Sequence, residues 1–249
     1  MLRSIEGEVA WVTGAGTGIG QAGAISLADA GVKVILTGRR QEPLEHTAAV
    51  IREAGGEALI APGDFTDRTT IAAIVKQIID RYGRIDILVN SAGINIPKRS
   101  WATVEAEGFD SVVAADLNGP FYTTHAVLPI MRAQKDGLII QISSWAGVYV
   151  SKLTGPAYNA AKHGLVALSE SINQEECVNG IRSCCICPGE VATPILDNRP
   201  VPVTDEQKAQ MLQSEDLGET ILYVARMPKS VCVNEILISP THNRGYTGF

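Results

Sequence analysis

Apolar and polar positions along the chain follow two different periods. Short continuous apolar runs, rich in Val and Ile, alternate with longer stretches in which apolar residues recur every three or four positions. Continuous apolar runs are typical of strands buried on both faces of a parallel sheet, and the wider spacing is typical of helices packed against it. The pattern therefore predicts an α/β fold, a doubly wound parallel sheet of about seven strands with helices on both faces. The predicted strands are Glu8 to Thr13, Val32 to Thr37, Glu57 to Ala61, Ile85 to Asn90, Leu138 to Ser143, Ile181 to Cys187 and Val233 to Ser239.

The chain has no linker rich in Pro or Ser, no low-complexity tract and no internal repeat. We therefore predict a single domain over residues 1–249. The least regular segment, 193–215, carries Pro194, Pro200 and Pro202. An insertion of this kind between a strand and a helix forms either a mobile lid over a ligand or an exposed connection, and the sequence leaves both open.

Charge and hydropathy limit the partners of the chain. The formal net charge of −6 argues against nucleic acid, because duplex-binding proteins usually present a basic surface. No apolar run approaches the ~20 residues that a membrane-spanning helix needs, and the first residues lack the long apolar core of a signal peptide. We expect a cytoplasmic protein with neither a nucleic-acid nor a membrane partner.

Three of the five cysteines lie close together, at Cys184, Cys185 and Cys187. Successive side chains of a strand point to opposite faces, so Cys185 and Cys187 would share one face and Cys184 would take the other. A metal site needs ligands that converge, and the four histidines are scattered along the chain. We expect the cysteines to be buried, reduced core residues and predict no metal site.

A glycine-rich segment follows the first predicted strand and opens the first predicted helix. Glycines at such a position let the backbone approach a pyrophosphate, and the amides and dipole of the helix N-terminus favour its negative charge. The segment therefore predicts a Rossmann-type dinucleotide site, with three residues between Gly14 and Gly18. Its candidate cofactor contacts are Gly14, Gly16, Thr17, Gly18, Ile19 and Gly20.

Tyr158 and Lys162 lie one helical turn apart, after the pair Ser143 and Ser144 at the end of an apolar run. At this spacing both side chains project from the same face of a helix, so the ammonium of Lys162 would stabilise a Tyr158 phenolate. A tyrosine that ordinarily titrates near pH ~10 then becomes a usable acid or base. The alternative is an ordinary half-buried tyrosine beside a surface lysine.

These motifs occur together with Asn90-Ser91-Ala92-Gly93 after the fourth strand and Pro188-Gly189 after the sixth. In that order, and over nearly the whole chain, they resemble the short-chain dehydrogenase/reductase family. The resemblance implies that Tyr158 is the general acid in carbonyl reduction and the general base in alcohol oxidation. Lys162 would lower the pKa of Tyr158 and hold the nicotinamide ribose. Ser144 would hydrogen-bond the substrate oxygen as charge develops on it.

One position departs from the family pattern. Members usually carry an Asn in an Asn-Leu-x-Gly segment, where it supports the lysine through water, and the matching segment here begins with Asp116. A carboxylate still accepts hydrogen bonds, but it adds a negative charge near Lys162. We therefore include Asp116 among the catalytic candidates.

Cofactor choice is expected at the end of the second strand. Relatives that prefer NAD place an acid there, which binds the ribose hydroxyls and would repel a 2′-phosphate, whereas this chain has Gly38 followed by Arg39 and Arg40. Guanidinium groups suit a phosphate, so NADP(H) is favoured and NAD(H) remains the alternative. By resemblance, the other cofactor contacts are Asp64, Phe65, Asn90, Ala92, Gly93, Tyr158, Lys162, Pro188, Gly189, Val191 and Thr193.

The substrate pocket is expected to be largely apolar, with few polar anchors and with Trp145 setting its shape. The candidate wall residues are Ile94, Asn95, Ile96, Trp145, Val148, Leu153, Glu190 and Leu196, together with Ser144.

The combined prediction is an oxidoreductase that transfers a hydride between NADP(H) and a secondary alcohol or ketone, a small-molecule substrate. The alternatives are an NAD-linked alcohol dehydrogenase and a catalytically idle sensor or scaffold that binds NADP(H). Retention of Ser144, Tyr158 and Lys162 argues against the idle form. The resemblance also implies a homodimer or homotetramer, assembled through two long helices over about Gly108 to Ala133 and Pro156 to Gly180.

Overall fold

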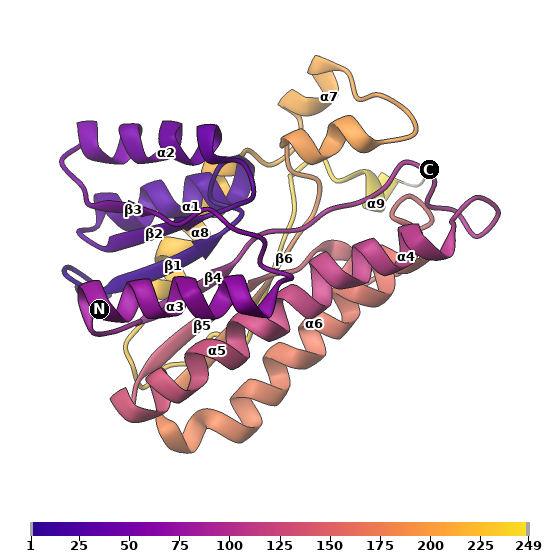
Figure 1. Ribbon diagram of the computed structural model, residues 1–249. Helices are drawn as coiled ribbons and strands as arrows, with labels where there is room; N and C mark the ends of the chain where they lie inside the picture. The colour runs from indigo at the N-terminus through magenta and orange to yellow at the C-terminus, as the bar shows by residue number, and fades with distance from the viewer. Residues whose placement is uncertain (1, 248–249) are drawn as a thin grey trace.

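The apolar runs form seven parallel strands of one sheet in the computed structural model, which describes residues 2–247 (Figure 1). The strand order is β3-β2-β1-β4-β5-β6-β7, so the chain winds outward from β1 in one direction and then from β4 in the other. The prediction of a doubly wound parallel sheet is confirmed. The strands are β1 (Val9–Thr13), β2 (Lys33–Thr37), β3 (Ala58–Ile60), β4 (Ile87–Asn90), β5 (Gly137–Ile142), β6 (Ile181–Pro188) and β7 (Glu235–Ile238).

Helices cover both faces of the sheet. In Figure 1, α1, α2 and α8 lie on one face, and α3, α5 and α6 lie on the other. The α-helices are α1 (Gly18–Asp29), α2 (Gln41–Glu53), α3 (Arg68–Tyr82), α4 (Ala106–Val113), α5 (Gly119–Gln134), α6 (Gly155–Glu176), α7 (Asp205–Ala209), α8 (Ser214–Ala225) and α9 (Arg244–Thr247). Shorter turns are the π-helical η1 (Ala114–Asn118) and the 3₁₀ segments η2 (Trp145–Gly147), η3 (Cys177–Asn179) and η4 (Pro194–Asn198).

Strand residues alternate between two apolar layers. Trp11 and Ile139 pack in the layer beneath α3 and α5, whereas Val12 and Ile140 pack in the layer beneath α1 and α8. All four side chains are fully buried. Because both faces of each central strand are covered, its sequence is a continuous apolar run and not an alternating one.

The first and the penultimate helices, α1 and α8, pack closely through small residues. A Cβ added at Gly23 of α1 would lie 2.6 Å from Cδ1 of Ile221, and one added at Gly218 of α8 would lie 2.9 Å from the carbonyl oxygen of Ala22. The small-residue face of α1 therefore packs against another helix as well as against the sheet.

Two strands begin two residues later than predicted. β4 begins at Ile87 and not at Ile85, because the amide of Ile85 donates to the side chain of Gln134 before the sheet ladder begins. β7 begins at Glu235 and not at Val233.

The cysteines divide into two groups. Cys184, Cys185 and Cys187 are buried in β6, with the sulfurs of Cys185 and Cys187 4.0 Å apart on one face, as expected from strand alternation. Cys177 and Cys232 are exposed, so the expectation that all five are core residues is wrong for these two. Cys177 begins the 3₁₀ turn η3 before β6, and Cys232 lies in the connection between α8 and β7.

Residues 2–247 contain no cluster of three or more side chains suited to a metal ion. Over the same residues, no helix is both long enough and apolar enough to cross a membrane.

The irregular segment 193–215 forms a small lobe with η4 and α7 beyond the carboxyl end of the sheet (Figure 1). Its far end returns to the sheet, because Leu212 forms a parallel bridge with Val191 and its amide donates to the carbonyl of Glu190 at 3.0 Å. The lobe is therefore a loop fixed at both ends.

Candidate functional site

A cleft of about 1760 Å³ lies at the carboxyl ends of the strands, at the point where the strand order reverses between β1 and β4. Open α/β sheets bind their ligands at this point, because the loops on the two sides diverge there. The volume exceeds the roughly 300–1,000 Å³ of a pocket for one drug-sized ligand, so it has room for a dinucleotide and a second molecule.

The structure brings most of the predicted site residues to this cleft. Of the predicted cofactor contacts, those that line it are Gly14, Gly16, Thr17, Gly18, Ile19, Arg39, Arg40, Asp64, Phe65, Ala92, Gly93, Tyr158, Lys162, Pro188, Gly189, Val191 and Thr193. The substrate candidates Ser144, Trp145, Asn95, Glu190 and Leu196 line it as well. Gly20 and Asn90 lie below its surface.

The glycine loop packs too closely on its neighbours for side chains. Gly14 has a φ of +67°, and a Cβ there would lie 2.8 Å from the backbone nitrogen of Ala92. A Cβ at Gly20 would lie 2.4 Å from the carbonyl oxygen of Gly14, so Gly20 lets α1 pack against the loop and does not face the cleft.

The N-terminus of α1 is open toward the same loop. Thr17 is the N-cap, but its side chain makes no capping hydrogen bond among the described residues, and no acidic residue lies in the first turn. Free amides and a positive helix end suit a pyrophosphate. The loop therefore fits the phosphates of a dinucleotide.

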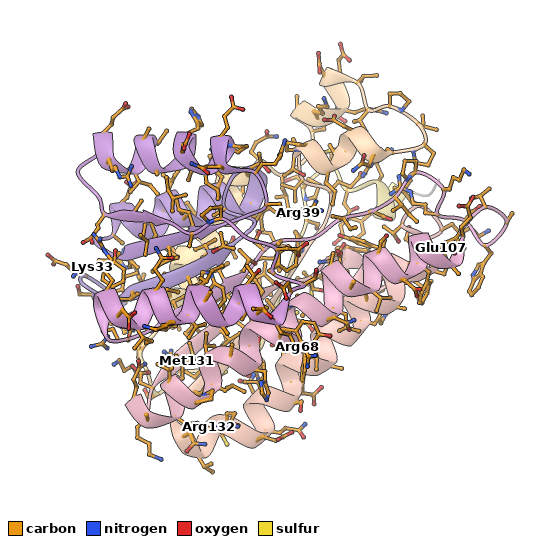
Figure 2. The ribbon with its side chains drawn as sticks, in the orientation of Figure 1. Lys33, Arg39, Arg68, Glu107, Met131 and Arg132 are labelled. Atoms are coloured by element: carbon orange, nitrogen blue, oxygen red, sulfur yellow. The ribbon has the colours of Figure 1, made fainter. Side chains whose placement is uncertain are left out.

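Arg39 and Arg40 line the cleft beside this loop, and both are exposed. Figure 2 shows Arg39 just beyond the N-terminal end of α2, on the side that faces the α7 lobe. Gly38 precedes them and also lines the cleft, so no acidic side chain occupies the position after β2. Two guanidiniums without an adjacent acid fit a phosphate ester better than a pair of ribose hydroxyls.

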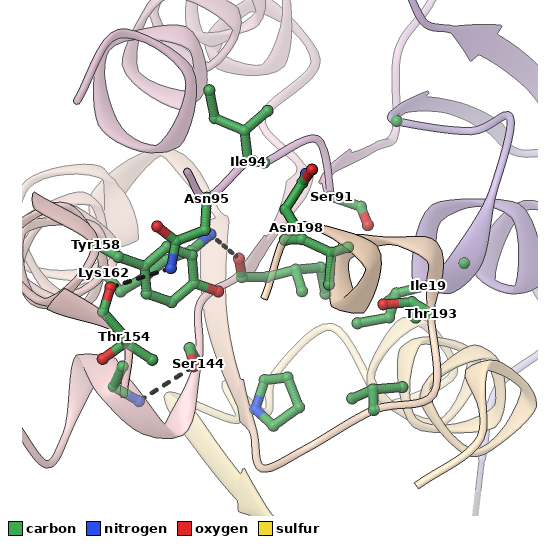
Figure 3. Close-up of a pocket in the computed structure, with 18 of the residues that line it drawn as sticks. Ile19, Ser91, Ile94, Asn95, Ser144, Thr154, Tyr158, Lys162, Thr193 and Asn198 are labelled. Carbon is green, nitrogen blue, oxygen red and sulfur yellow. Dashed lines mark hydrogen bonds between the residues drawn. The ribbon is translucent and has the colours of Figure 1, made fainter. Parts of the chain in front are cut away.

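Tyr158 and Lys162 lie on α6, and Ser144 lies at the end of β5 (Figure 3). The ammonium nitrogen of Lys162 is 5.4 Å from the centroid of the Tyr158 ring and donates to the carbonyl of Ile142 at 3.0 Å. Ser144 is the N-cap of η2, and its hydroxyl accepts from the amide of Ala146 at 3.1 Å. The Ser143 hydroxyl instead donates to the carbonyl of Lys162 at 2.9 Å, which fixes α6 to β5.

The electrostatics of Tyr158 differ from the sequence expectation. Burial raises the pKa of Tyr158 above its ordinary value, and the negative charge of Asp116 raises it further. Lys162 and Ser144 lower the pKa as expected, and so does the charge of Arg99, but these effects do not outweigh burial. The phenol is therefore held in its neutral form in the protein alone.

Asp116 lies in the π-helical turn η1 and is fully buried. One carboxylate oxygen is 3.3 Å from the ammonium nitrogen of Lys162, and the other accepts from the amide of Ile94 at 2.7 Å. Burial alone would lower the pKa of Lys162, but the adjacent carboxylate raises it overall. The π-helical turn adds a residue to the helix and is a common device at functional sites. Asp116 contacts the lysine directly, without an intervening water.

Three predicted contacts are already engaged within the protein. The carboxylate of Glu190 pairs with Arg199 at 2.7 Å and also with Arg244, so its charge is engaged by two arginines. The Asn95 amide donates to the carbonyl of Thr154 at 3.0 Å, which fixes the loop after β4 to the start of α6. Asn90 is 2% exposed and donates to Gln141 of β5 at 3.1 Å, so its side chain clamps the sheet beneath the cleft.

The expectation of a largely apolar substrate pocket did not include three charged side chains. Arg99, Arg199 and Arg244 all line the cleft, and the sequence analysis identified none of them. They come from the loop after β4, the α7 lobe and the C-terminal segment, which no local pattern brings together. An aromatic wall does exist, because the Trp145 ring lies 4.9 Å from that of Tyr149.

Comparisons with known proteins agree with this geometry. Residues 8–201 match the model of the short chain dehydrogenase family. An uncharacterized oxidoreductase of Staphylococcus saprophyticus is 33% identical over 241 residues, which cover 96% of this chain and 100% of that protein.

Solved structures extend the likeness to proteins with bound cofactors. A metagenomic short-chain oxidoreductase in complex with NADP has a TM-score of 0.83 and 32% identity, over 96% of this chain and 99% of that one. A 3-ketoacyl-(acyl-carrier-protein) reductase from Brucella melitensis complexed with NADH has a TM-score of 0.85 and 27% identity, over 94% of this chain and 97% of that one. Proteins of this fold therefore occur with either nicotinamide cofactor.

Proposed function

This chain belongs to the short-chain dehydrogenase/reductase family, and on that premise we propose that it transfers a hydride between NADP(H) and a secondary alcohol or ketone. The observation that carries the proposal is the convergence of Ser144, Tyr158 and Lys162 on one wall of a cleft whose opposite end is a phosphate-binding loop. Figure 3 shows Ile19 and Thr193 across the pocket from these three residues.

Tyr158 transfers the proton in this mechanism. In the reducing direction its hydroxyl donates a proton to the substrate oxygen, while the Ser144 hydroxyl donates a hydrogen bond to the same oxygen as negative charge develops there. In the oxidising direction the phenolate accepts the proton of the alcohol. A bound nicotinamide supplies or accepts the hydride at the substrate carbon.

Lys162 stabilises the phenolate form of Tyr158, which carries a negative charge. Its ammonium is 4% exposed and is held by Asp116 and the carbonyl of Ile142, so it remains charged beside the ring. The lysine would also hold the nicotinamide ribose, as the family resemblance implies. The phosphate loop and α1 would hold the pyrophosphate.

Preference for NADP(H) rests on Arg39 and Arg40 and on the absence of an acid at Gly38. Arg39→Ala is expected to weaken NADPH binding more than NADH binding, because only NADPH has the 2′-phosphate. A hydrogen bond to a charged group contributes about 1.5–3 kcal/mol, so a tenfold or larger change in the ratio of the two dissociation constants is expected. Gly38→Asp should deepen the change by repulsion. Equal losses with both cofactors would show that Arg39 supports the loop.

A panel of ketones and secondary alcohols, followed by reduced-nicotinamide absorbance with each cofactor, tests the whole proposal. Turnover with NADPH that exceeds turnover with NADH supports it, and faster turnover with NADH favours an NAD-linked alcohol dehydrogenase. Tight NADPH binding with no turnover across the panel would favour the idle sensor or scaffold instead. Tyr158→Phe is the matched negative control, since it keeps the ring and removes the proton.

A further inference from the structure

Arg99 is a buried guanidinium without a counter-ion. It lies in the loop after β4, lines the cleft and is 8% exposed. Among residues 2–247 no carboxylate pairs with it, and its Nε has no hydrogen-bond partner. One terminal nitrogen donates to the carbonyl of Asn198 at 3.4 Å, which is longer than an ordinary hydrogen bond. A buried charge that is neither paired nor fully hydrogen-bonded is costly, so its presence calls for a ligand.

The backbone places Arg99 beside the catalytic tyrosine. Gly155, the first residue of α6, has a φ of +79°, and a Cβ there would lie 2.1 Å from the carbonyl oxygen of Arg99. Tyr158 follows three residues later on the same helix. The bond from Asn95 to Thr154 fixes the same loop to the same helix end, and both residues lie beside the Tyr158 ring in Figure 3.

Electrostatic influence agrees with this placement. The positive charge of Arg99 lowers the pKa of Tyr158, although burial has the larger, opposite effect. Burial lowers the pKa of Arg99 itself, and the charge of Arg199 lowers it further. A guanidinium remains charged in proteins, so two positive groups lie close together at this end of the cleft.

The ion pairs at this end of the cleft leave the charge of Arg99 unbalanced. Arg199 pairs with the carboxylate of Glu190, whereas no described residue offsets the charge of Arg99. Asp116 is engaged with Lys162. An anion that enters the cleft would therefore meet a net positive field and a guanidinium able to form paired hydrogen bonds.

We propose that the substrate carries a carboxylate, which Arg99 binds while Ser144 and Tyr158 contact the carbonyl or hydroxyl that reacts. This inference rests on the proposed function and makes it narrower: the substrates are short oxo acids and hydroxy acids. In reduction a hydride goes to the carbonyl carbon and the Tyr158 proton to its oxygen, and the carboxylate is unchanged. A planar fork of N–H donors matches the two oxygens of a carboxylate.

The test compares acids with their uncharged counterparts. Pyruvate, acetoacetate and levulinate differ in the distance between carboxylate and ketone, and each is compared with its methyl ester as a substrate with NADPH. The wild-type protein should prefer one acid over its ester by roughly ten- to hundredfold in kcat/KM, and Arg99→Met should abolish that preference. Equal preference in both proteins would overturn the proposal.

Lys98→Met is the matched control, because Lys98 lies in the same loop but is exposed and pairs with Glu105 at 2.8 Å. It removes the same charge and should leave the acid preference unchanged. The melting temperature of Arg99→Met should not fall, since no carboxylate is left unpaired. NADPH affinity should also be unchanged in Arg99→Met, and a comparable loss there would assign Arg99 to the cofactor and overturn the proposal.

Binding measurements test the carboxylate site independently of the proposed function. Calorimetry with each oxo acid and its ester, on the protein bound to NADP⁺, measures binding without turnover, because the oxidised cofactor cannot reduce them. Acid binding that is lost in Arg99→Met supports the carboxylate site even if no compound is reduced. A protein that reduces neutral ketones, yet binds acids and esters equally, would keep the proposed function and reject this inference. Preference for dihydroxyacetone phosphate over every acid would reject the carboxylate in favour of a phosphate.

Discussion

Opposing influences act on the pKa of Tyr158. Burial and the charge of Asp116 raise it, whereas Lys162, Ser144 and Arg99 lower it, and the net shift is upward. A neutral phenol can donate a proton, so under the proposed function we expect carbonyl reduction to proceed near neutral pH. Alcohol oxidation needs the phenolate and is expected to require a more basic solution.

Tyr158→Phe removes only the transferable proton. We expect kcat to fall by ~10²-fold or more, as for loss of a general acid, with the NADPH dissociation constant nearly unchanged. Steady-state kinetics and a fluorescence titration of NADPH measure the two quantities. Near-normal turnover in this variant would refute the assignment of Tyr158.

Asp116→Asn should change the pH dependence more than the rate. Removing the carboxylate charge takes away an influence that raises the pKa of Tyr158, so that pKa falls. The rise of oxidation rate with pH should therefore occur at lower pH in the variant than in the wild type. The measurement is a pH profile of kcat for alcohol oxidation.

Asp116→Ala is the companion variant to Asp116→Asn. It leaves the buried ammonium of Lys162 without its carboxylate 3.3 Å away, and breaking a buried pair in this way costs about 3–5 kcal/mol. Both activity and the free energy of unfolding should fall well below those of Asp116→Asn. Wild-type rates and an unmoved pH profile in both variants would mean that Asp116 does not act on the lysine.

Site residues that lie at a fixed spacing along the chain could be predicted from the sequence. Site residues whose contacts are distant in the sequence could not. Tyr158 and Lys162 are four positions apart on one helix, so sequence spacing alone places them on one face. Arg99 and Glu190 are different, because their partners are set by how the loop after β4, the α7 lobe and the C-terminal segment fold together. The direction of the overall pKa shift of Tyr158 could not be predicted either, because the burial that raises this pKa depends on the packed structure.

The end of β6, the α7 lobe and α9 are joined through one carboxylate. Glu190 follows β6, Arg199 follows η4 and Arg244 begins α9. Burial alone would raise the pKa of Glu190, but hydrogen bonds from Arg244 and Arg199 lower it overall. Together with the bridge between Val191 and Leu212, this cluster fixes one wall of the cleft.

Glu190→Gln tests that cluster. At pH 7 the variant should lose about 1.5–3 kcal/mol of stability, the contribution of hydrogen bonds to a charged group. Because the folded pKa is lowered, this contribution is present above the unfolded value of about 4.3 and disappears as the pH falls through the folded value. Thermal unfolding of both proteins from pH 7 to pH 3 should show the difference shrinking in acid. Glu105→Gln, which removes an exposed pair, should show little difference at any pH.

The sheet was predicted nearly in full because its strands are buried on both faces and therefore appear as continuous apolar runs. The helix ends and loops were less predictable. Ile85, for example, begins the predicted run, but in the structure its amide donates to the side chain of Gln134 and its carbonyl accepts from the same side chain. The π-helical turn at Asp116 was not predicted from the sequence either.

Assembly of the whole molecule is expected on the face that carries α4, α5 and α6. Phe121 of α5 is 46% exposed, and its ring lies 5.9 Å from that of His125. An exposed phenylalanine on a long helix suits an apolar interface with a second copy.

Phe121→Lys should lower the assembly state while leaving the circular dichroism spectrum intact, because the side chain contributes little to the core. Light scattering after gel filtration gives the mass of each protein. Tyr223→Lys, at a residue 47% exposed on α8 in the opposite layer, is the matched control and should keep the wild-type mass. If both variants and the wild type have the same mass, this face of α5 is not the interface.

The close packing of α1 on α8 also governs how the protein is made. A ribosome delivers the chain from its N-terminus, so α1 emerges long before Ser214, where α8 begins. Until then α8 cannot cover the small-residue face of α1 around Gly23, and the glycine loop at the N-terminus of α1 rests on a helix that is only half packed. The cofactor site proposed at that loop is therefore expected to form only near the end of synthesis.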